Sequence, residues 1–217
     1  MTVEQARFNM IEQQIRPWEV LDQGVLGLLA TVQREEFVPP GCRALAFFDT
    51  EVPLAEGQCM LAPKVEARLL QALALNGSES VLEVGAGSGF MAALLARQSE
   101  RVTSLEIRPA LAAFARDNLR RAGIANAQVV DVDGRSGYPA QAPFDAIVLS
   151  GSVADVPPSL LAQLAIGARL VAIVGQEPVM RAVSIVRIGE QQYKRTELFD
   201  TVALRLDGFP EPGRFTF

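Results

Sequence analysis

The sequence feature that most constrains the fold is the glycine-rich run VLEVGAGSGF, residues 81–90, which separates an apolar segment from a helix-like one. Gly85, Gly87 and Gly89 alternate with small residues in this run. Glycine reaches positive φ angles without a steric penalty and lets a ligand approach the backbone closely. A helix that begins where the run ends presents unpaired N–H groups. The run therefore predicts a strand that turns sharply into a helix at a ligand site, with a turn that binds nothing as the alternative.

The residues around this run alternate between short apolar stretches and amphipathic ones, which is typical of a parallel sheet with helical crossovers. The apolar stretches predict strands at residues 80–84, 101–107, 127–132, 144–150, 169–174, 182–188 and 196–205. The amphipathic stretches predict helices at residues 90–97, 110–122 and 159–164. The expected fold class is α/β, a doubly wound, mostly parallel Rossmann-like sheet whose last two strands are antiparallel. Such sheets bind ligands at the carboxyl ends of their strands, where the glycine run lies.

The N-terminal third predicts a helical extension with a loop-rich end. One helix begins after Asp22, a candidate N-cap, and another follows Pro63 and ends at Asn76-Gly77. Turn-forming residues fill the interval between them. The length favours a single domain. We expect that domain to span residues 1–217, with a helical and substrate-loop region at 1–75 and a ligand-binding Rossmann-like core at 76–217.

Composition excludes several kinds of site and partner. The chain has no histidine, which removes histidine bases, Ser-His-Asp triads and histidine-ligated metals. Its two cysteines, Cys42 and Cys59, are too few for a zinc site or a disulfide framework, so we expect no metal. A net charge of −5 disfavours binding to nucleic acid or to an anionic membrane. The sequence contains neither an apolar run of transmembrane length nor a signal peptide, so we expect a cytoplasmic location.

Side chains at the ends of the first three predicted strands indicate the ligand. Phe90 stands where a dinucleotide fingerprint needs a small residue, which argues against NAD and FAD. Glu83 precedes the first glycine and suits the cationic amino and sulfonium groups of S-adenosylmethionine (SAM). Glu106 ends the second strand, where a carboxylate can accept both ribose hydroxyls of a nucleoside, a solvated surface charge being the alternative. Asp133-Gly134 follows the third strand, where the carboxylate can accept from an adenine amino group, although such a pair is often only a turn.

These motifs carry a resemblance to a known family. The order VLEVGAGSGF, LEI, DVDG, APFDAIVLSGS and LAQLAIGARLVAIVG resembles class I SAM-dependent methyltransferases. REEFVP and the loop FFDTEVPLAEGQCMLAP resemble the protein-L-isoaspartate O-methyltransferase family, and the resemblance covers about residues 5–205. It implies SAM as cofactor and methylation of the α-carboxylate of an isoaspartyl residue, or of a D-aspartyl side chain, in a protein or peptide. The cofactor-binding residues that we predict are Met60, Leu61, Glu83, Gly85, Gly87, Gly89, Glu106, Ile107, Asp133 and Gly134.

The sequence departs from the family pattern in the loop before Pro63. The family carries an active-site serine two residues before this proline, and Leu61 stands there in this chain. We do not expect Cys59 to replace the serine, because methyl transfer needs no covalent intermediate and a lone cysteine is more often a small buried hydrophobe. A carboxylate acceptor is ionised at neutral pH, so no general base is needed, and no residue is assigned a catalytic role.

The missing hydroxyl leaves three functions open. The first is isoaspartyl methylation, which we expect to be weak because an acceptor carboxylate would lose a hydrogen bond beside a leucine. The second is a related methyltransferase with another acceptor, and the third is a SAM-binding module without catalysis. The sequence does not indicate an oligomeric state.

Overall fold

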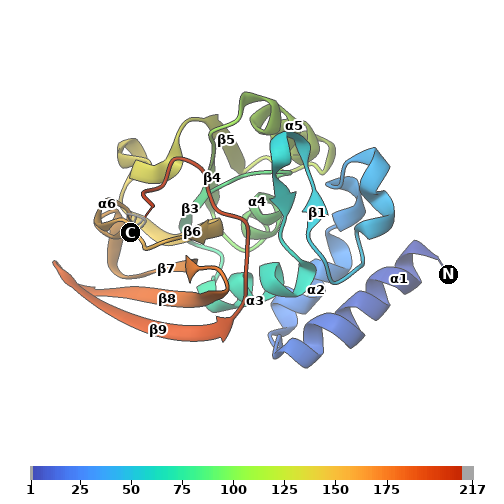
Figure 1. Cartoon of the computed structure of the whole chain (residues 1–217), viewed down its shortest axis with the longest axis horizontal. Coiled ribbons are helices and arrows are strands. Elements are labelled where there is room, and N and C mark those ends of the chain that lie inside the picture. Colours follow the sequence, from blue (N-terminus) through green and yellow to red (C-terminus); the bar gives the residue numbers. More distant parts are fainter. Residues whose placement is uncertain (1, 212–217) are drawn as a thin grey trace, which may run out of the picture.

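The computed structural model describes residues 2–211, and a seven-stranded sheet forms its centre (Figure 1). The strands lie in the order β5-β4-β3-β6-β7-β8-β9. Pairing is parallel from β5 through β7 and antiparallel from β7 through β9. The predicted mostly parallel sheet with antiparallel final strands is therefore confirmed. The strand bounds are β3 Ser80–Val84, β4 Arg101–Glu106, β5 Ala127–Asp131, β6 Phe144–Val153, β7 Leu164–Gln176, β8 Val179–Gly189 and β9 Gln192–Asp200.

Strand β3 is the point where the order of the strands reverses. It pairs in parallel with β4 on one side and with β6 on the other. All five of its residues are buried, which matches the apolar run that predicted it. A crevice for ligands forms outside the carboxyl end of a strand at such a reversal. The glycine run follows β3 directly and therefore lies at this crevice.

The two faces of the sheet are covered unequally. Alternate strand residues point to opposite faces, so Val81 and Leu82 belong to separate buried clusters. The cluster around Val81 contains residues of α2 Gln23–Thr31, α3 Pro63–Leu73, α4 Phe90–Ala96 and α5 Pro109–Arg121. The cluster around Leu82 contains the one-turn helix α6 Pro158–Leu161 and Phe209 of the C-terminal segment. The C-terminal segment thus takes part in covering the face that lacks long helices.

The N-terminal extension lies beside the sheet, with α1 and α2 next to α3 (Figure 1). Helix α1, Val3–Met10, continues as a π-helical turn, Ile11–Ile15, and a 3₁₀ turn, Arg16–Trp18. Helix α2 begins after Asp22, whose carboxylate accepts from the Val25 N–H at 2.9 Å as the sequence predicts. A short hairpin of β1, Val52–Pro53, and β2, Cys59–Met60, completes the region before α3.

Two predicted element ends differ from the structure for identifiable reasons. Helix α3 ends at Leu73, because Ala74 takes a left-handed conformation with φ of +44° before Asn76-Gly77 is reached. Strand β9 ends at Asp200 although the apolar pattern continues to residue 205. The chain there leaves the sheet edge and bonds to the end of β6, where the N–H of Leu206 donates to the Ser152 carbonyl at 2.9 Å.

Candidate functional site

The glycine run forms the sharp turn between β3 and α4 that the sequence predicts. Gly85, Gly87 and Gly89 have φ angles of +94°, +53° and +81°, a region that other residues rarely adopt. The N–H groups of Gly85 and Ala86 donate to the Leu105 carbonyl at 2.8 and 3.1 Å. These bonds fasten the turn to the end of β4, so the loop and the second strand form one rigid edge.

Glu106 holds the middle of this turn from the end of β4. Its carboxylate accepts from the Gly87 N–H at 2.8 Å and from the Arg108 N–H at 3.0 Å. The side chain is buried, so the alternative of a solvated surface charge is wrong. Two carboxylate oxygens have about four lone-pair positions. The contacts with Gly87 and Arg108 use two of them, which leaves acceptor capacity for the hydroxyl groups of a ligand.

Glu83 lies fully buried at the end of β3. Ser104 of β4 donates to one carboxylate oxygen at 2.5 Å, and Ser150 of β6 donates to the other at 2.7 Å. Burial raises the pKa of the Glu83 carboxyl to about 8, although the two serine hydrogen bonds act in the opposite direction. A nearby cation would favour the ionised form. The geometry therefore offers a buried acid that responds to a positively charged ligand.

Two small cavities adjoin these residues and share Cys59, Gly85, Gly87 and Ser150 in their walls. The first, which we call the Glu106 cavity, measures about 50 Å³. The second, the Glu66 cavity, measures about 20 Å³. The Glu106 cavity contains the predicted residues Gly85, Gly87, Glu106, Ile107 and Gly134. The Glu66 cavity contains the predicted residues Met60, Leu61, Glu83, Gly85 and Gly87.

Asp133 and Gly89 take structural positions beside these cavities. The Asp133 carboxylate caps a 3₁₀ turn, Gly134–Ser136, by accepting from the Arg135 N–H at 3.0 Å, and it also pairs with the Arg135 Nε at 3.0 Å. A Cβ on Gly89 would lie 3.1 Å from the Ala115 carbonyl oxygen, so this glycine lets α4 and α5 approach. Neither residue lines the Glu106 or Glu66 cavity. Their role toward a cofactor stays a prediction.

The segment of residues 47–62, which we call the Leu61 loop, forms the wall of the Glu66 cavity opposite the glycine turn. Met60 and Leu61 are buried and line the Glu66 cavity together with Glu66 of α3. The side chain at position 61 presents carbon atoms to this space, because leucine has no polar group. Cys59 also lines it, and burial, followed by the charge of Glu51, raises the pKa of its thiol to about 12. A thiol with such a pKa is protonated at neutral pH, which is consistent with the prediction that Cys59 is not a nucleophile.

A buried ion pair holds this wall in place. Arg34 is 1% exposed and pairs with the carboxylate of Glu66. Its guanidinium also donates to the Leu61 carbonyl at 2.8 Å and lies 4.9 Å from the centre of the Phe90 ring. Burial raises the pKa of the Glu66 carboxyl to about 7, although the charge and the hydrogen bond of Arg34 act in the opposite direction. One arginine thus joins the Leu61 loop, helix α3 and the first residue of α4.

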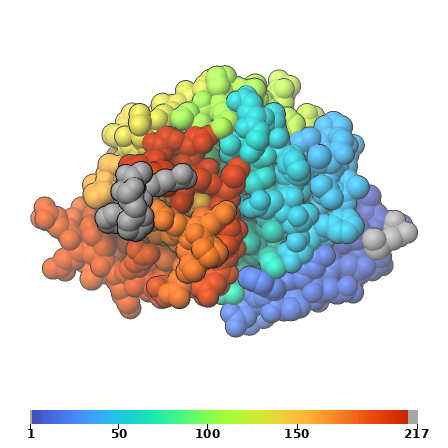
Figure 2. All heavy atoms as spheres, viewed as in Figure 1, coloured from blue at the N-terminus to red at the C-terminus, as the bar shows by residue number. Residues whose placement is uncertain are grey.

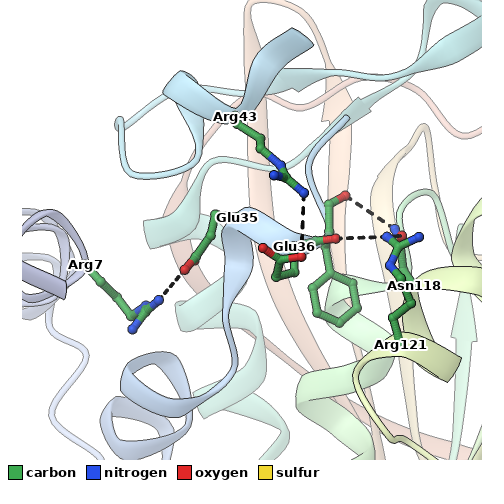
Figure 3. A network of polar contacts seen from close by, with 7 residues as sticks. Arg7, Glu35, Glu36, Arg43, Asn118 and Arg121 are labelled. Carbon is green, nitrogen blue, oxygen red and sulfur yellow. Dashed lines mark hydrogen bonds and ion pairs between the residues drawn. The ribbon is translucent and has the colours of Figure 1, made fainter. Parts of the chain in front are cut away.

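The neighbours of Arg34 in the REEFVP motif fix its backbone from outside. Glu35 pairs with Arg7 of α1, and Glu36 lies 3.6 Å from Arg43 (Figure 3). The Glu36 carbonyl accepts from Arg121 of α5 at 3.3 Å. Glu35 and Glu36 therefore contact three further parts of the chain, and of the three charged residues only Arg34 is fully buried.

A larger cavity of about 510 Å³ lies away from this site. Residues 31–33 and 36–37, Arg97 just after α4, and residues at and just after the C-terminal end of α5 line it, and it includes none of the predicted site residues. It also lies away from the carboxyl ends of β3, β4 and β6, where a fold of this kind binds ligands. Cavity size alone is therefore a poor guide to the site, and the two small cavities are the better candidates.

Comparison with known proteins decides the family. Residues 5–204 match the family model described as protein-L-isoaspartate(D-aspartate) O-methyltransferase. The chain belongs to this family. A protein-L-isoaspartate O-methyltransferase of Rhodopseudomonas palustris is 41% identical over 207 residues, which cover 94% of this chain and 95% of the relative. One of Methanoculleus marisnigri is 40% identical and covers 83% of this chain and 82% of its own length.

Solved structures show the same fold. A Plasmodium falciparum protein assigned as a protein-L-isoaspartate O-methyltransferase, solved with S-adenosyl-L-homocysteine, superposes with a TM-score of 0.78 and 21% identity. That match covers 92% of this chain and 97% of the other. A second protein-L-isoaspartate O-methyltransferase superposes with a TM-score of 0.80 and 22% identity, and covers 95% of this chain and 66% of the other.

Several residues of this methyltransferase site lay outside the sequence prediction. The sequence does not link Ser104 and Ser150 to Glu83, because hydroxyl groups on strands are common. Glu66 carried a detectable signal: it lies three, four and seven residues before Leu69, Leu70 and Leu73, and so falls on the apolar face of α3. A carboxylate there requires a buried partner. The sequence gives no distance between Glu66 and Arg34, and the partner was therefore not foreseeable.

Residues 2–211 contain no group of three or more histidine, cysteine, aspartate or glutamate side chains arranged to hold a metal ion. None of their helices is both long and apolar enough to span a membrane.

Proposed function

We propose that this chain is a SAM-dependent O-methyltransferase that methylates the carboxyl group of isoaspartyl residues in proteins or peptides. One observation carries the proposal. The carboxyl end of β3 brings together a glycine turn, the buried Glu83 and the acceptor carboxylate of Glu106, in a chain whose family acts on isoaspartyl substrates. Relatives of about 40% identity along most of the chain bear the name of this activity.

The carboxylates and the glycine turn at the site fit SAM. At Gly87, φ is positive and a Cβ would lie 3.3 Å from the side chain of Leu54, so the loop there has little room for a larger residue. Glu106 has acceptor positions free for ribose hydroxyls, and Glu83 favours a cation. Gly134 lies so close to β3 that a Cβ would be 2.4 Å from Val84, and it lines the Glu106 cavity together with Ile107. A pyrophosphate would meet two carboxylates here, whereas an amino acid and a nucleoside would meet suitable partners.

The proposed chemistry requires positioning more than proton transfer. SAM, when bound, supplies an electrophilic methyl group on a sulfonium centre. Glu106 and the glycine turn would hold the nucleoside, and Glu83 would hold the cationic end. The Met60–Leu61 wall would exclude water from the space that an acceptor carboxylate enters. Because that carboxylate is already ionised at neutral pH, the chain gains rate by orientation and by removal of water.

A second acceptor class is favoured by the wall itself. The Leu61 side chain offers no hydrogen bond, and Glu66, the other polar residue on this side of the cavity, is already paired with Arg34. When an acceptor carboxylate is buried without one of its hydrogen bonds, its binding free energy becomes less favourable by about 1–3 kcal/mol. Three kcal/mol corresponds to a rate loss of more than about a hundredfold. A less polar acceptor would meet no such penalty, and it is the alternative function within the same family.

Transfer of a labelled methyl group from SAM to an isoaspartyl peptide tests the proposal. We would compare the natural protein with Leu61→Ser and with Leu21→Ser, a control at an exposed leucine away from the site. A rate in the natural protein supports isoaspartyl methylation, and a rise of ten- to a hundredfold in Leu61→Ser identifies position 61 as limiting. If neither protein is active but a panel of other acceptors is methylated, the second acceptor class is correct. Binding of SAM without any transfer would leave the chain as a SAM-binding module.

A further inference from the structure

Segments from two distant parts of the chain cover the Glu106 cavity. Gln58 and Cys59 of the Leu61 loop line it on one side, and Leu206, Asp207 and Phe209 of the C-terminal segment line it on another. Figure 1 shows the C-terminal segment running from β9 across the front of the sheet, and Figure 2 shows it at the surface next to the cyan residues that precede α3. The cavity encloses about 50 Å³, whereas sites for ligands of this size measure roughly 300–1,000 Å³. The covering segments must therefore separate to admit such a ligand.

Arg108 joins the two covering segments. It stands two residues after Glu106, and its own N–H donates to that carboxylate at 3.0 Å. Its Nε lies 3.4 Å from a carboxylate oxygen of Glu56 in the Leu61 loop. Its Nη1 forms an ion pair with Asp207 in the C-terminal segment. Across residues 2–211, no other ion pair connects these two segments.

The C-terminal segment is attached by main-chain bonds up to Leu206 and by other contacts beyond it. Main-chain bonds to Ser152 end with the Leu206 N–H, at 2.9 Å. The Leu206 side chain fills the space beside Gly85 and Gly151, where an added Cβ would come within 2.8 Å of it. From Asp207 to residue 211, the described chain makes no main-chain to main-chain bond. It is held there by the ion pairs of Asp207 and Glu211, by a bond from Arg135 to the Gly208 carbonyl at 3.4 Å, and by the buried side chain of Phe209. A change of direction after Leu206 would thus break the Arg108 pair and expose Phe209, but it would break no main-chain ladder.

We propose that Arg108 is the latch of a lid over the cofactor cavity. The lid consists of residues 207–211 on one side and residues 55–58 on the other, and the ion pairs of Arg108 hold both against the edge that Glu106 forms. A ligand enters and leaves when these pairs separate. Arg108 is a positioning residue, since it acts through the segments that it holds. The identity of the ligand rests on the proposed function, whereas the latch rests on the contacts of Arg108.

The rate at which S-adenosylhomocysteine leaves the protein tests the latch. Stopped-flow displacement would compare the natural protein with Arg108→Gln, Glu56→Gln and Asp207→Asn. We expect release to become three- to tenfold faster in Arg108→Gln, with smaller increases when one acidic partner is removed. The control is Arg181→Gln, because Arg181 also has two acidic partners, Glu197 and Asp200, but lies on β8. It should release the ligand at the natural rate.

Salt provides an independent comparison. Ion pairs with partly exposed partners weaken as ionic strength rises. Release from the natural protein should therefore accelerate between 0.05 and 0.5 M NaCl (about a threefold drop in the screening length), and release from Arg108→Gln should change by less than twofold. If Arg108→Gln and the natural protein release the ligand at equal rates in low salt, the latch is wrong, while the proposed function stands.

A measurement without ligand separates the two proposals. Amide hydrogen exchange at Leu206, whose N–H makes the last main-chain bond before the lid, should be faster in Arg108→Gln than in the natural protein, while exchange in β3 stays unchanged. Equal exchange at Leu206 would overturn the latch. If S-adenosylhomocysteine does not bind the natural protein, the proposed cofactor is wrong, and the exchange comparison still decides whether Arg108 holds the lid.

Discussion

The two walls of the cleft are built in different ways. The wall that carries Glu83 and Glu106 consists of strand ends and a turn whose N–H groups bond to Leu105 and Glu106. The wall that carries Leu61 is held by the side chain of Arg34, which lies 27 residues earlier in the sequence. Main-chain geometry thus fixes the first wall, and one buried ion pair fixes the second. We infer from this difference that substitutions can change the methyl acceptor at the second wall while the first wall keeps its cofactor.

The largest effect should come from the turn of the first wall. Gly87→Val places a β-branched side chain at a φ of +53° and 3.3 Å from Leu54. We expect the affinity for S-adenosylhomocysteine to fall more than about a hundredfold, measured by calorimetric titration. Gly123→Val is the matched control, because Gly123 also has positive φ but has open space around it and lies far from the turn. Normal affinity in a folded Gly87→Val would show that main-chain geometry does not determine the first wall.

Arg34→Met tests the second wall. It leaves Glu66 buried without its partner, which should lower the free energy of unfolding by about 3–5 kcal/mol. The double variant Arg34→Met, Glu66→Met should regain most of that stability, because an apolar pair can replace a buried ion pair. With Leu61 no longer held, methyl transfer in the double variant should fall about a hundredfold, while the affinity for S-adenosylhomocysteine changes less than threefold. Chemical denaturation measures the free energy of unfolding, and methyl-transfer assays measure the rate. A natural rate in the double variant would mean that the pair does not position the loop.

Glu106→Ala asks whether the first wall is one unit. The variant should weaken SAM binding by about 1.5–3 kcal/mol, or roughly ten- to a hundredfold. It should also reduce stability by about 1–3 kcal/mol, because the N–H groups of Gly87 and Arg108 lose their partner. Asp131→Ala is the control, since Asp131 is an exposed carboxylate next to Glu106 in the sheet register. Weaker binding with unchanged melting temperature would show that Glu106 serves the ligand and not the turn.

The pH dependence of binding gives the smallest effect. The Glu83 carboxyl has a pKa of about 8, and a cationic ligand favours its ionised form, so binding should release a proton. The affinity for S-adenosylhomocysteine should then rise by up to about fivefold between pH 7 and pH 8. Titrations in buffers of different ionisation enthalpy would detect the released proton. Glu83→Gln should bind weakly and show no such rise, and a rise that persists in it would assign the proton to another group.

The sequence predicts the first wall much better than the second. Gly85, Gly87 and Gly89 adopt the predicted conformations because positive φ is a local requirement that glycine meets. The place of Leu61 in a motif identifies it as a site residue, but the sequence does not show that Arg34 holds it. The contact between Arg34 and Glu66 depends on how α3 packs against the REEFVP segment, and no local pattern encodes that distance.

The bounds of the central strand β3 are also easier to predict from the sequence than those of the edge strand β9. The buried run of β3 predicts its bounds correctly, because all five of its residues are buried in the centre of the sheet. The final apolar pattern does not stop at Asp200, although β9 does. Of the apolar residues that follow, Ala203 is buried in the core, whereas Val202 and Leu204 are exposed, so the pattern there does not mark a strand.

The buried acid at the end of β3 also bears on how long the protein survives in a cell. In an unfolded chain the pKa of the Glu83 carboxyl would be about 4.3. With a native pKa of about 8, the folded and unliganded protein holds the extra proton between these values, so its free energy of unfolding falls as pH rises through that window. The slope reaches about 1.4 kcal/mol per pH unit. A ligand that binds the folded state restores stability by mass action. Degradation of this protein should therefore slow when its cofactor is abundant and quicken when the cofactor is scarce.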